Sequence, residues 1–73
     1  MNEPQAGQIY RHYKGHRCEI VGTARHSETE EELVIYWHDW QGHPQLWARP
    51  LIMFMENVES EDYSGPRFTL IEE

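Results

Sequence analysis

Polar and apolar residues alternate with a period of two in several short segments of this chain. The alternation is clearest in residues 17–21 and 45–49, and an apolar run of β-branched and aromatic residues occupies positions 33–37. Successive side chains on a strand point to opposite faces, and β-branched and aromatic side chains pack well on a pleated sheet. Together with the short, β-prone segments 8–13 and 67–71, this pattern predicts five strands.

Turn-forming residues separate the predicted strands. Gly15 lies in the turn of a first hairpin, and a glycine and a proline interrupt the chain at residues 39–44, in the middle of a second hairpin. Gly22 follows the second strand, where glycine favours a β-bulge or a positive φ angle. Such a distortion would direct the chain into a polar loop at residues 24–31. The segment at residues 60–66, which contains two acidic side chains, a glycine and a proline, is expected to form a surface turn before the last strand.

A single helical turn is predicted after the fourth strand. Pro50 fixes its own φ angle, suits the first position of a helix and keeps the preceding residue extended. We expect residues 50–54 to form this turn. Leu51 or Ile52, together with Phe54, would then pack under the sheet.

These elements predict a mainly β fold, a small and strongly bent antiparallel barrel of the SH3-like kind with about five strands and one short helical turn. An open antiparallel sheet is the alternative. A chain of 73 residues has room for one domain. We expect this domain to span residues 7–71, after a disordered lead-in at residues 1–6 and before an acidic end at residues 72–73.

The charge of the chain disfavours some classes of partner. The formal net charge is −7, which opposes non-specific binding to nucleic acid or to anionic lipid. The charge is uneven, because residues 1–27 carry four basic and two acidic groups, whereas residues 28–73 carry two basic and eleven acidic groups. A local patch that attracts anions is therefore compatible with the acidic total.

Other features of the composition favour a cytoplasmic protein that does not enter a membrane. No apolar run approaches the roughly 18 residues that span a bilayer, and the N-terminal residues lack the pattern of a signal peptide. The single cysteine, Cys18, cannot form an internal disulfide. It alternates with Ile20, so we expect a buried thiol that behaves as a small hydrophobic group.

Five ordered motifs at compatible spacing extend over nearly the whole chain. They are Gly7-Gln8-Ile9-Tyr10-Arg11-His12-Tyr13-Lys14-Gly15, Ala24-Arg25-His26-Ser27-Glu28-Thr29, Leu46-Trp47-Ala48-Arg49-Pro50, Met53-Phe54-Met55-Glu56-Asn57-Val58 and Pro66-Arg67-Phe68. Together they resemble a small bacterial family that is catalogued as domain of unknown function 1653. The resemblance implies a compact, mostly β, cytoplasmic bacterial domain without an assigned activity.

The loop around His26 concentrates groups that could do chemistry. In one interpretation His26 acts as a base beside a hydroxyl nucleophile, but adjacent residues on an extended chain point to opposite faces, so this hydrogen bond needs a special loop conformation. In another, Ser27 and Thr29 bond to the loop backbone while Arg25 pairs with a nearby glutamate. Contact with a ligand is the third interpretation. We therefore assign no catalytic residue.

The histidines do not show the spacing of a metal site. A structural zinc site uses four ligands in recognisable pairs, and the only close pair is His16-x-Cys18. The residues considered were His12, His16, Cys18, His26, His38 and His43. We predict neither a metal nor a cofactor.

Trp47 and Arg49 are the strongest candidates for recognition. Strand alternation places both on the side away from Leu46, and Trp, Tyr and Arg are enriched at binding hot spots. Alternatively, Trp47 closes one end of the barrel and Arg49 makes a structural ion pair.

We therefore predict a non-enzymatic binding module with an Arg/aromatic surface for another protein, a peptide or a small anionic ligand. The candidate ligand-binding residues are Tyr10, Arg11, Tyr13, Arg25, His26, Ser27, Trp47 and Arg49. The alternative is a small hydrolase or transferase that uses His26 with a neighbouring hydroxyl or carboxylate.

Overall fold

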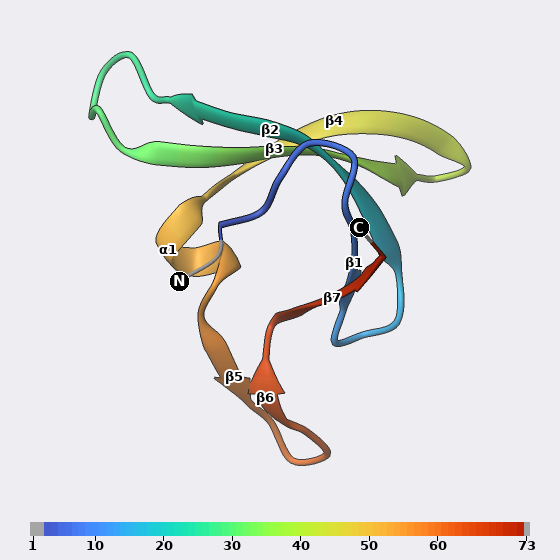
Figure 1. The fold of residues 1–73 in the computed structure, drawn as a ribbon. Helices are drawn as coiled ribbons and strands as arrows, with labels where there is room; N and C mark the ends of the chain where they lie inside the picture. Colours follow the sequence, from blue (N-terminus) through green and yellow to red (C-terminus); the bar gives the residue numbers. More distant parts are fainter. Residues whose placement is uncertain (1–2, 73) are drawn as a thin grey trace.

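A computed structural model describes residues 3–72 of the chain, and within them it contains seven strands and one short helix (Figure 1). The elements are β1 (Ile9–His12), β2 (Arg17–Arg25), β3 (Glu32–Trp40), β4 (His43–Pro50), α1 (Leu51–Phe54), β5 (Asn57–Glu59), β6 (Ser64–Pro66) and β7 (Phe68–Glu72). The prediction of a mainly β protein with one short helical turn is confirmed. None of the described residues belongs to a helix with the length and apolar character that a membrane crossing requires.

The strands form one large antiparallel sheet and one small hairpin. The sheet has the order β4-β3-β2-β1-β7, and β5 pairs with β6 in the hairpin. A closed barrel requires its first and last strands to pair. Within residues 3–72 no pairing joins the edge strands β4 and β7, so the SH3-like barrel is not found, and the curved sheet in Figure 1 is open.

The second and third strands are longer than the sequence pattern indicates. They form a hairpin that pairs as far as Arg25 and Glu32, so the polar loop predicted at residues 24–31 is shortened to 26–31. The predicted bulge is confirmed, because the register shifts between Ile20 and Gly22 and Gly22 adopts a φ of 155°. The bulge lets β2 continue past the glycine while it bends.

The hairpin of β3 and β4 turns more tightly than we predicted. The predicted interruption at residues 39–44 is wrong, because Trp40 pairs with His43 across a two-residue turn. Gln41 and Gly42 have φ angles of 52° and 84°, the two positive values of the turn type that best matches strand twist. Pro44 lies within β4 and is tolerated there, because an edge strand has one side without partners.

The core lies between one face of the large sheet and α1, and we call this sheet face the inner face. Its buried side chains are Tyr10, Cys18, Ile20, Val34, Tyr36, Phe54 and Phe68. Phe54 is 1% exposed, and its ring stacks on that of Phe68 with centroids 4.0 Å apart. The predicted packing of the helical turn is confirmed for Phe54 and Leu51, whereas Ile52 is 75% exposed.

The segment before β1 packs on the sheet. Pro4 is buried, the N–H of Gly7 donates to the carbonyl of Ile20, and the N–H of Gln5 donates to the side chain of Gln8. These contacts differ from the disordered lead-in that we expected at residues 1–6, of which residues 1–2 lie outside the described part of the chain, as does residue 73. A buried proline needs no hydrogen bond for its missing N–H, which suits it to this position.

Candidate functional site

Six aromatic and imidazole rings form a continuous row across the inner face, and we call them the ring row. In spatial order they are Phe68, His12, His16, His38, Trp47 and Trp40. The centroid distances between successive rings are 5.0, 4.5, 4.1, 6.0 and 5.6 Å. Rings at these distances are in contact, so the row connects β7 at one edge of the sheet with β4 at the other.

Strand alternation explains the position of most of these rings. His12 follows the buried Tyr10 by two residues in β1. His38 and Trp40 likewise follow the buried Tyr36 by two and four residues in β3. Side chains two residues apart on a strand share a face, so each of these rings points to the side that carries the core.

His16 reaches the ring row through the turn between β1 and β2. The N–H of His12 donates to the carbonyl of His16 at 2.7 Å, and the N–H of Gly15 donates to the carbonyl of His12 at 2.7 Å. These two bonds fold the chain back on itself. The imidazole of His16 is thereby stacked on that of His12, with an interplanar angle of 10°.

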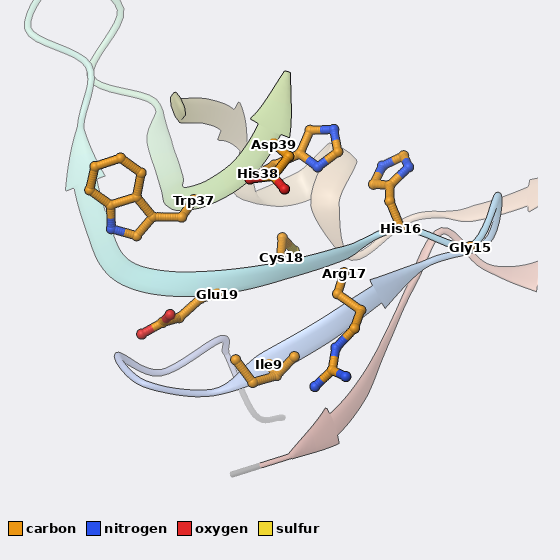
Figure 2. Close-up of a pocket in the computed structure, with 9 residues that line it drawn as sticks. All are labelled: Ile9, Gly15, His16, Arg17, Cys18, Glu19, Trp37, His38 and Asp39. Atoms are coloured by element: carbon orange, nitrogen blue, oxygen red, sulfur yellow. The ribbon is translucent and has the colours of Figure 1, made fainter. Parts of the chain in front are cut away.

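A hollow lies beside the histidines, where β3 separates from β2. The pairing of β2 with β3 ends at this side with Glu19 and Trp37, and the residues that precede Glu19 in β2 pair only with β1. The hollow has a volume of about 450 Å³. Figure 2 shows the imidazoles of His16 and His38 next to each other beside it. A ligand in the hollow would therefore reach ring edges and polar nitrogens together.

Arg49 is a half-buried cation on the same face. Its Nε donates to the hydroxyl of Tyr36 at 3.3 Å, and its Cζ lies 5.3 Å from the centroid of the Phe68 ring. Arg17 and Arg67 each form a salt bridge with a glutamate, but within residues 3–72 Arg49 forms none. The guanidinium is thus held in place by a hydroxyl and an aromatic ring, and its charge is not neutralised by a carboxylate.

The groups that act on the buried His12 and on the more exposed His16 are neighbouring imidazoles and basic side chains, and none is a carboxylate. Burial is the main reason that the pKa of His12 is lowered to about 4, and burial also lowers the pKa of His16. The charges of Arg49 and Lys14 contribute to lowering both pKa values. Both imidazoles are therefore neutral near pH 7, and Arg49 supplies the fixed positive charge of the site.

The histidines stack on one another, so their nitrogens do not point to a common centre. His16 and His38 have an interplanar angle of 31° at a centroid distance of 4.1 Å. In the described part of the chain no group of three or more His, Cys, Asp or Glu side chains is placed to hold a metal ion. Cys18 is buried as predicted, and burial raises the pKa of its thiol to about 11, so it remains protonated near neutral pH.

Trp47 and Arg49 share a face, as the alternation in β4 predicts. They lie opposite Tyr36 and Val34 of β3, and this is the inner face of the sheet. The indole N–H of Trp47 donates to the carbonyl of His38 at 3.2 Å, which fixes the ring at the end of the histidines. The two side chains are therefore positioned together, next to the ring row.

The first strand contributes less to the surface than we predicted. Tyr10 is 6% exposed and packs edge-on against Phe54, so it belongs to the core and is not accessible to a ligand. Arg11 is exposed on the opposite face, because it alternates with Tyr10 and His12. Tyr13 lies in the following turn and stacks on Tyr63 at 5.4 Å, beside a second, smaller hollow.

The loop after β2 is held by its own hydrogen bonds. Arg25 donates from Nη1 to the carbonyl of Glu30 at 2.8 Å, and Nδ1 of His26 accepts from the N–H groups of Glu28 and Thr29. The hydroxyl of Thr29 accepts from the N–H of Glu31 at 3.2 Å, as we expected of the loop hydroxyls. His26 makes the contacts that we expected of Ser27, which is exposed, and Arg25 bonds to the Glu30 carbonyl where we expected a glutamate carboxylate.

The register separates this loop from Trp47. Arg25 lies opposite Glu32, whereas Trp47 lies opposite Tyr36, about 13 Å further along β3. Arg25 therefore does not lie beside Trp47 and Arg49, although we predicted all three as residues of one binding surface. The two arginines belong to different parts of the molecule.

Apart from Trp47, no residue of the ring row was predicted as a ligand-binding residue, and its three histidines were considered only as metal ligands. His38 and Trp40 continue the alternation that includes Tyr36, so the sequence pattern could have identified them. We expected the strand to end at residue 37, whereas β3 extends to Trp40. His16 has no such signal, because the turn geometry brings it to His12.

Comparisons with known proteins agree on the family. The family model described as protein of unknown function (DUF1653) matches residues 8–70. A similar solved structure is that of a protein belonging to DUF1653 from Bordetella bronchiseptica, with 30% sequence identity, a TM-score of 0.80, and coverage of 97% of this chain and 88% of that one. A search of curated proteins found no match.

Proposed function

Because the chain belongs to the DUF1653 family, whose description assigns no activity, we propose a function from its geometry: it is a binding module whose inner face takes an anionic ligand that carries a flat or apolar group. The anionic part would lie at Arg49 and the flat part against Trp47 and the neighbouring histidines. The observation that carries this proposal is the half-buried guanidinium of Arg49, which has no carboxylate partner within residues 3–72.

A half-buried arginine without a counter-ion favours anion binding for electrostatic reasons. Removing a charge from water has a cost that is offset by a partner of opposite sign. The Nε of Arg49 is occupied by Tyr36, and its terminal nitrogens form no hydrogen bond to the described residues. A guanidinium of this kind can donate two parallel hydrogen bonds to a carboxylate or a phosphate.

The ring row supplies the second half of the recognition surface. Trp47 is partly exposed and Trp40 is 52% exposed, and their rings meet edge to face at 5.6 Å. Large rigid aromatic side chains provide contact area with little loss of conformational entropy. An aromatic or apolar group attached to the anion would therefore bind beside Arg49.

The contacts of His26 support binding over hydrolysis. Its Nδ1 accepts two loop N–H groups, so only Nε2 is available to a substrate. A base that activates a nucleophile is usually oriented by a third group through its other nitrogen, commonly an acceptor. Loop amides are donors, so Nδ1 is the acceptor nitrogen of the neutral ring, the ring proton is on Nε2, and Nε2 has no free lone pair with which to take a proton from a nucleophile.

We expect Arg49→Gln to weaken the binding of phenyl phosphate by about 1.5–3 kcal/mol, because a charge-assisted hydrogen bond is lost. The binding can be followed by NMR titration of the backbone amides. Arg11→Gln is the matched control, since it removes the same charge from an exposed arginine on the outer face. Equal weakening by the two substitutions would attribute binding to net charge alone, and the absence of any shift at Trp47 and Arg49 would refute the proposal.

A further inference from the structure

We propose that β4 forms an antiparallel strand pair with an extended peptide whose acidic side chain lies opposite Arg49. This inference rests on the proposed function, because it names the class of partner that the anion-binding face takes. It is supported by a separate feature, the free edge of the sheet, so strand pairing at β4 and anion binding at Arg49 can be tested separately.

The edge of β4 is long and unpaired. The strand extends over eight residues and pairs on one side with β3. On its other side, no backbone hydrogen bond to any of residues 3–72 is made, and Figure 1 shows β4 at the margin of the sheet. Unpaired N–H and C=O groups along an edge strand are a template for a further strand.

The positions of the prolines identify which groups face outward. In a hairpin with a two-residue turn, the residues that flank the turn, here Trp40 and His43, exchange hydrogen bonds, and hydrogen-bonded and non-hydrogen-bonded positions alternate from there. Pro44 and Pro50 then occupy positions that do not bond to β3. Leu46 and Ala48 have the same parity, so their N–H and C=O groups point away from β3.

The middle of β4, at residues 45–48, lacks the usual protection of an edge strand. Natural edges are guarded by charged side chains, by bulges or by prolines. The register of β3 with β4 is uninterrupted, and residues 45–48 carry no charge. The two prolines limit pairing at both ends, which leaves a window of residues 45–49 for a partner.

The side chains of the window specify an acidic partner. Trp47 and Arg49 project to the inner face. Their backbone groups bond to β3, so they would form non-hydrogen-bonded pairs with an added strand. In such pairs the Cα atoms of the two facing residues are only about 4.5 Å apart, so their side chains are close. An acidic residue opposite Arg49 and, two residues later in an antiparallel peptide, an apolar residue opposite Trp47 would match them. Residues 40–55 contain no Asp or Glu in a chain that has 13, so this segment would not repel the peptide.

A second copy of this chain fits the edge less well. If two copies of β4 paired about a twofold axis at Trp47, each Arg49 would face Gln45 of the other copy, and neither guanidinium would gain a carboxylate. The unneutralised charge of Arg49 therefore favours a peptide with an acidic side chain over self-association.

The experiment uses a short synthetic peptide with blocked ends, made of threonine and serine except for a glutamate and, two positions later, a tyrosine. We expect the peptide to slow amide hydrogen exchange at Leu46 and Ala48. We expect Ala48→Pro, which removes one outward N–H, to weaken binding about fivefold or more, while the matched control Ala48→Ser leaves binding nearly unchanged. N-methylation of the peptide amides that face β4 removes the opposite set of strand-pairing bonds, those that the peptide donates to the carbonyls of Leu46 and Ala48, without altering the protein.

The outcomes separate the two proposals. If Arg49→Gln weakens both the peptide and phenyl phosphate, while Ala48→Pro and N-methylation weaken neither, strand pairing is refuted and the proposed function stands. If phenyl phosphate binds and the peptide does not, strand pairing is again refuted. If neither probe binds, both proposals fail. Protection of Leu46 and Ala48 that depends on protein concentration in the absence of peptide would identify a second copy as the occupant and would also refute the peptide.

Discussion

Replacing Phe54 with alanine is expected to lower the free energy of unfolding by about 3–5 kcal/mol, the range typical of a fully buried phenylalanine. The ring stacks on Phe68 at 4.0 Å and meets Tyr10 and Tyr36 at 5.2 and 5.8 Å. Its loss would leave a cavity among three aromatic side chains, those of Tyr10, Tyr36 and Phe68. A domain of 73 residues has a total stability of about 4–11 kcal/mol, so this variant should lose a large share of its stability.

The matched control lies on the same helical turn. Ile52 is 75% exposed, so Ile52→Ala should change the free energy of unfolding by less than about 0.5 kcal/mol. Urea unfolding followed by tryptophan fluorescence measures both variants. Similar losses for the two substitutions would mean that α1 contributes through its helical propensity and does not act as the cover of the core.

A second large effect is expected when the pH falls. The pKa of His12 is lowered to about 4 in the folded state, from an ordinary value of 6.5. The unfolded chain therefore binds more protons than the folded protein between these values, and stability decreases as the pH falls through this window. Above pH 6.5 His12 contributes fully to the free energy of unfolding. By about pH 4 this contribution, about 2–3 kcal/mol, is lost.

The structure gives a direct reason for this sensitivity. Nδ1 of His12 accepts the N–H of Lys14 at 3.1 Å, so a proton on Nδ1 would break that bond within a stack of rings. His12→Asn can keep an acceptor at this position but cannot be protonated in this range. We expect the variant to lose less stability than the wild type between pH 6.5 and 4 in thermal or urea unfolding. Identical pH profiles would show that carboxylates alone cause the acid sensitivity.

Much of the fold could be predicted because it depends on local chemistry. Pro50 sets the start of the helical turn, Gly22 marks the bulge, and alternation around Cys18 and Ile20 identifies the core face of β2. The end of β3 could not be predicted, because Asp39 is polar and its strand conformation is imposed by pairing with Pro44 of β4. Propensity is a weak guide where a neighbouring strand decides the conformation.

The candidate site was predictable only in part for a similar reason. Trp47 and Arg49 share one strand, so alternation alone places them together. The distance from Arg25 to Trp47 depends on the register of two strand pairs, which the bulge near Gly22 changes. The stack of His12 and His16 depends on the shape of a turn, and a sequence pattern does not determine it.

The order of the strands in the sheet has a consequence for folding. β2, β3 and β4 are neighbours in the chain and in the sheet, whereas the pairing of β1 with β7 joins distant segments, and the Arg17–Glu72 salt bridge at this edge spans 55 residues. Closing a long loop costs more entropy than forming a hairpin, so we expect the three-stranded meander to form the folding nucleus and β7 to join after the rate-limiting step. Leu70→Ala should then accelerate unfolding and leave the refolding rate nearly unchanged, and slower refolding would place β7 in the nucleus.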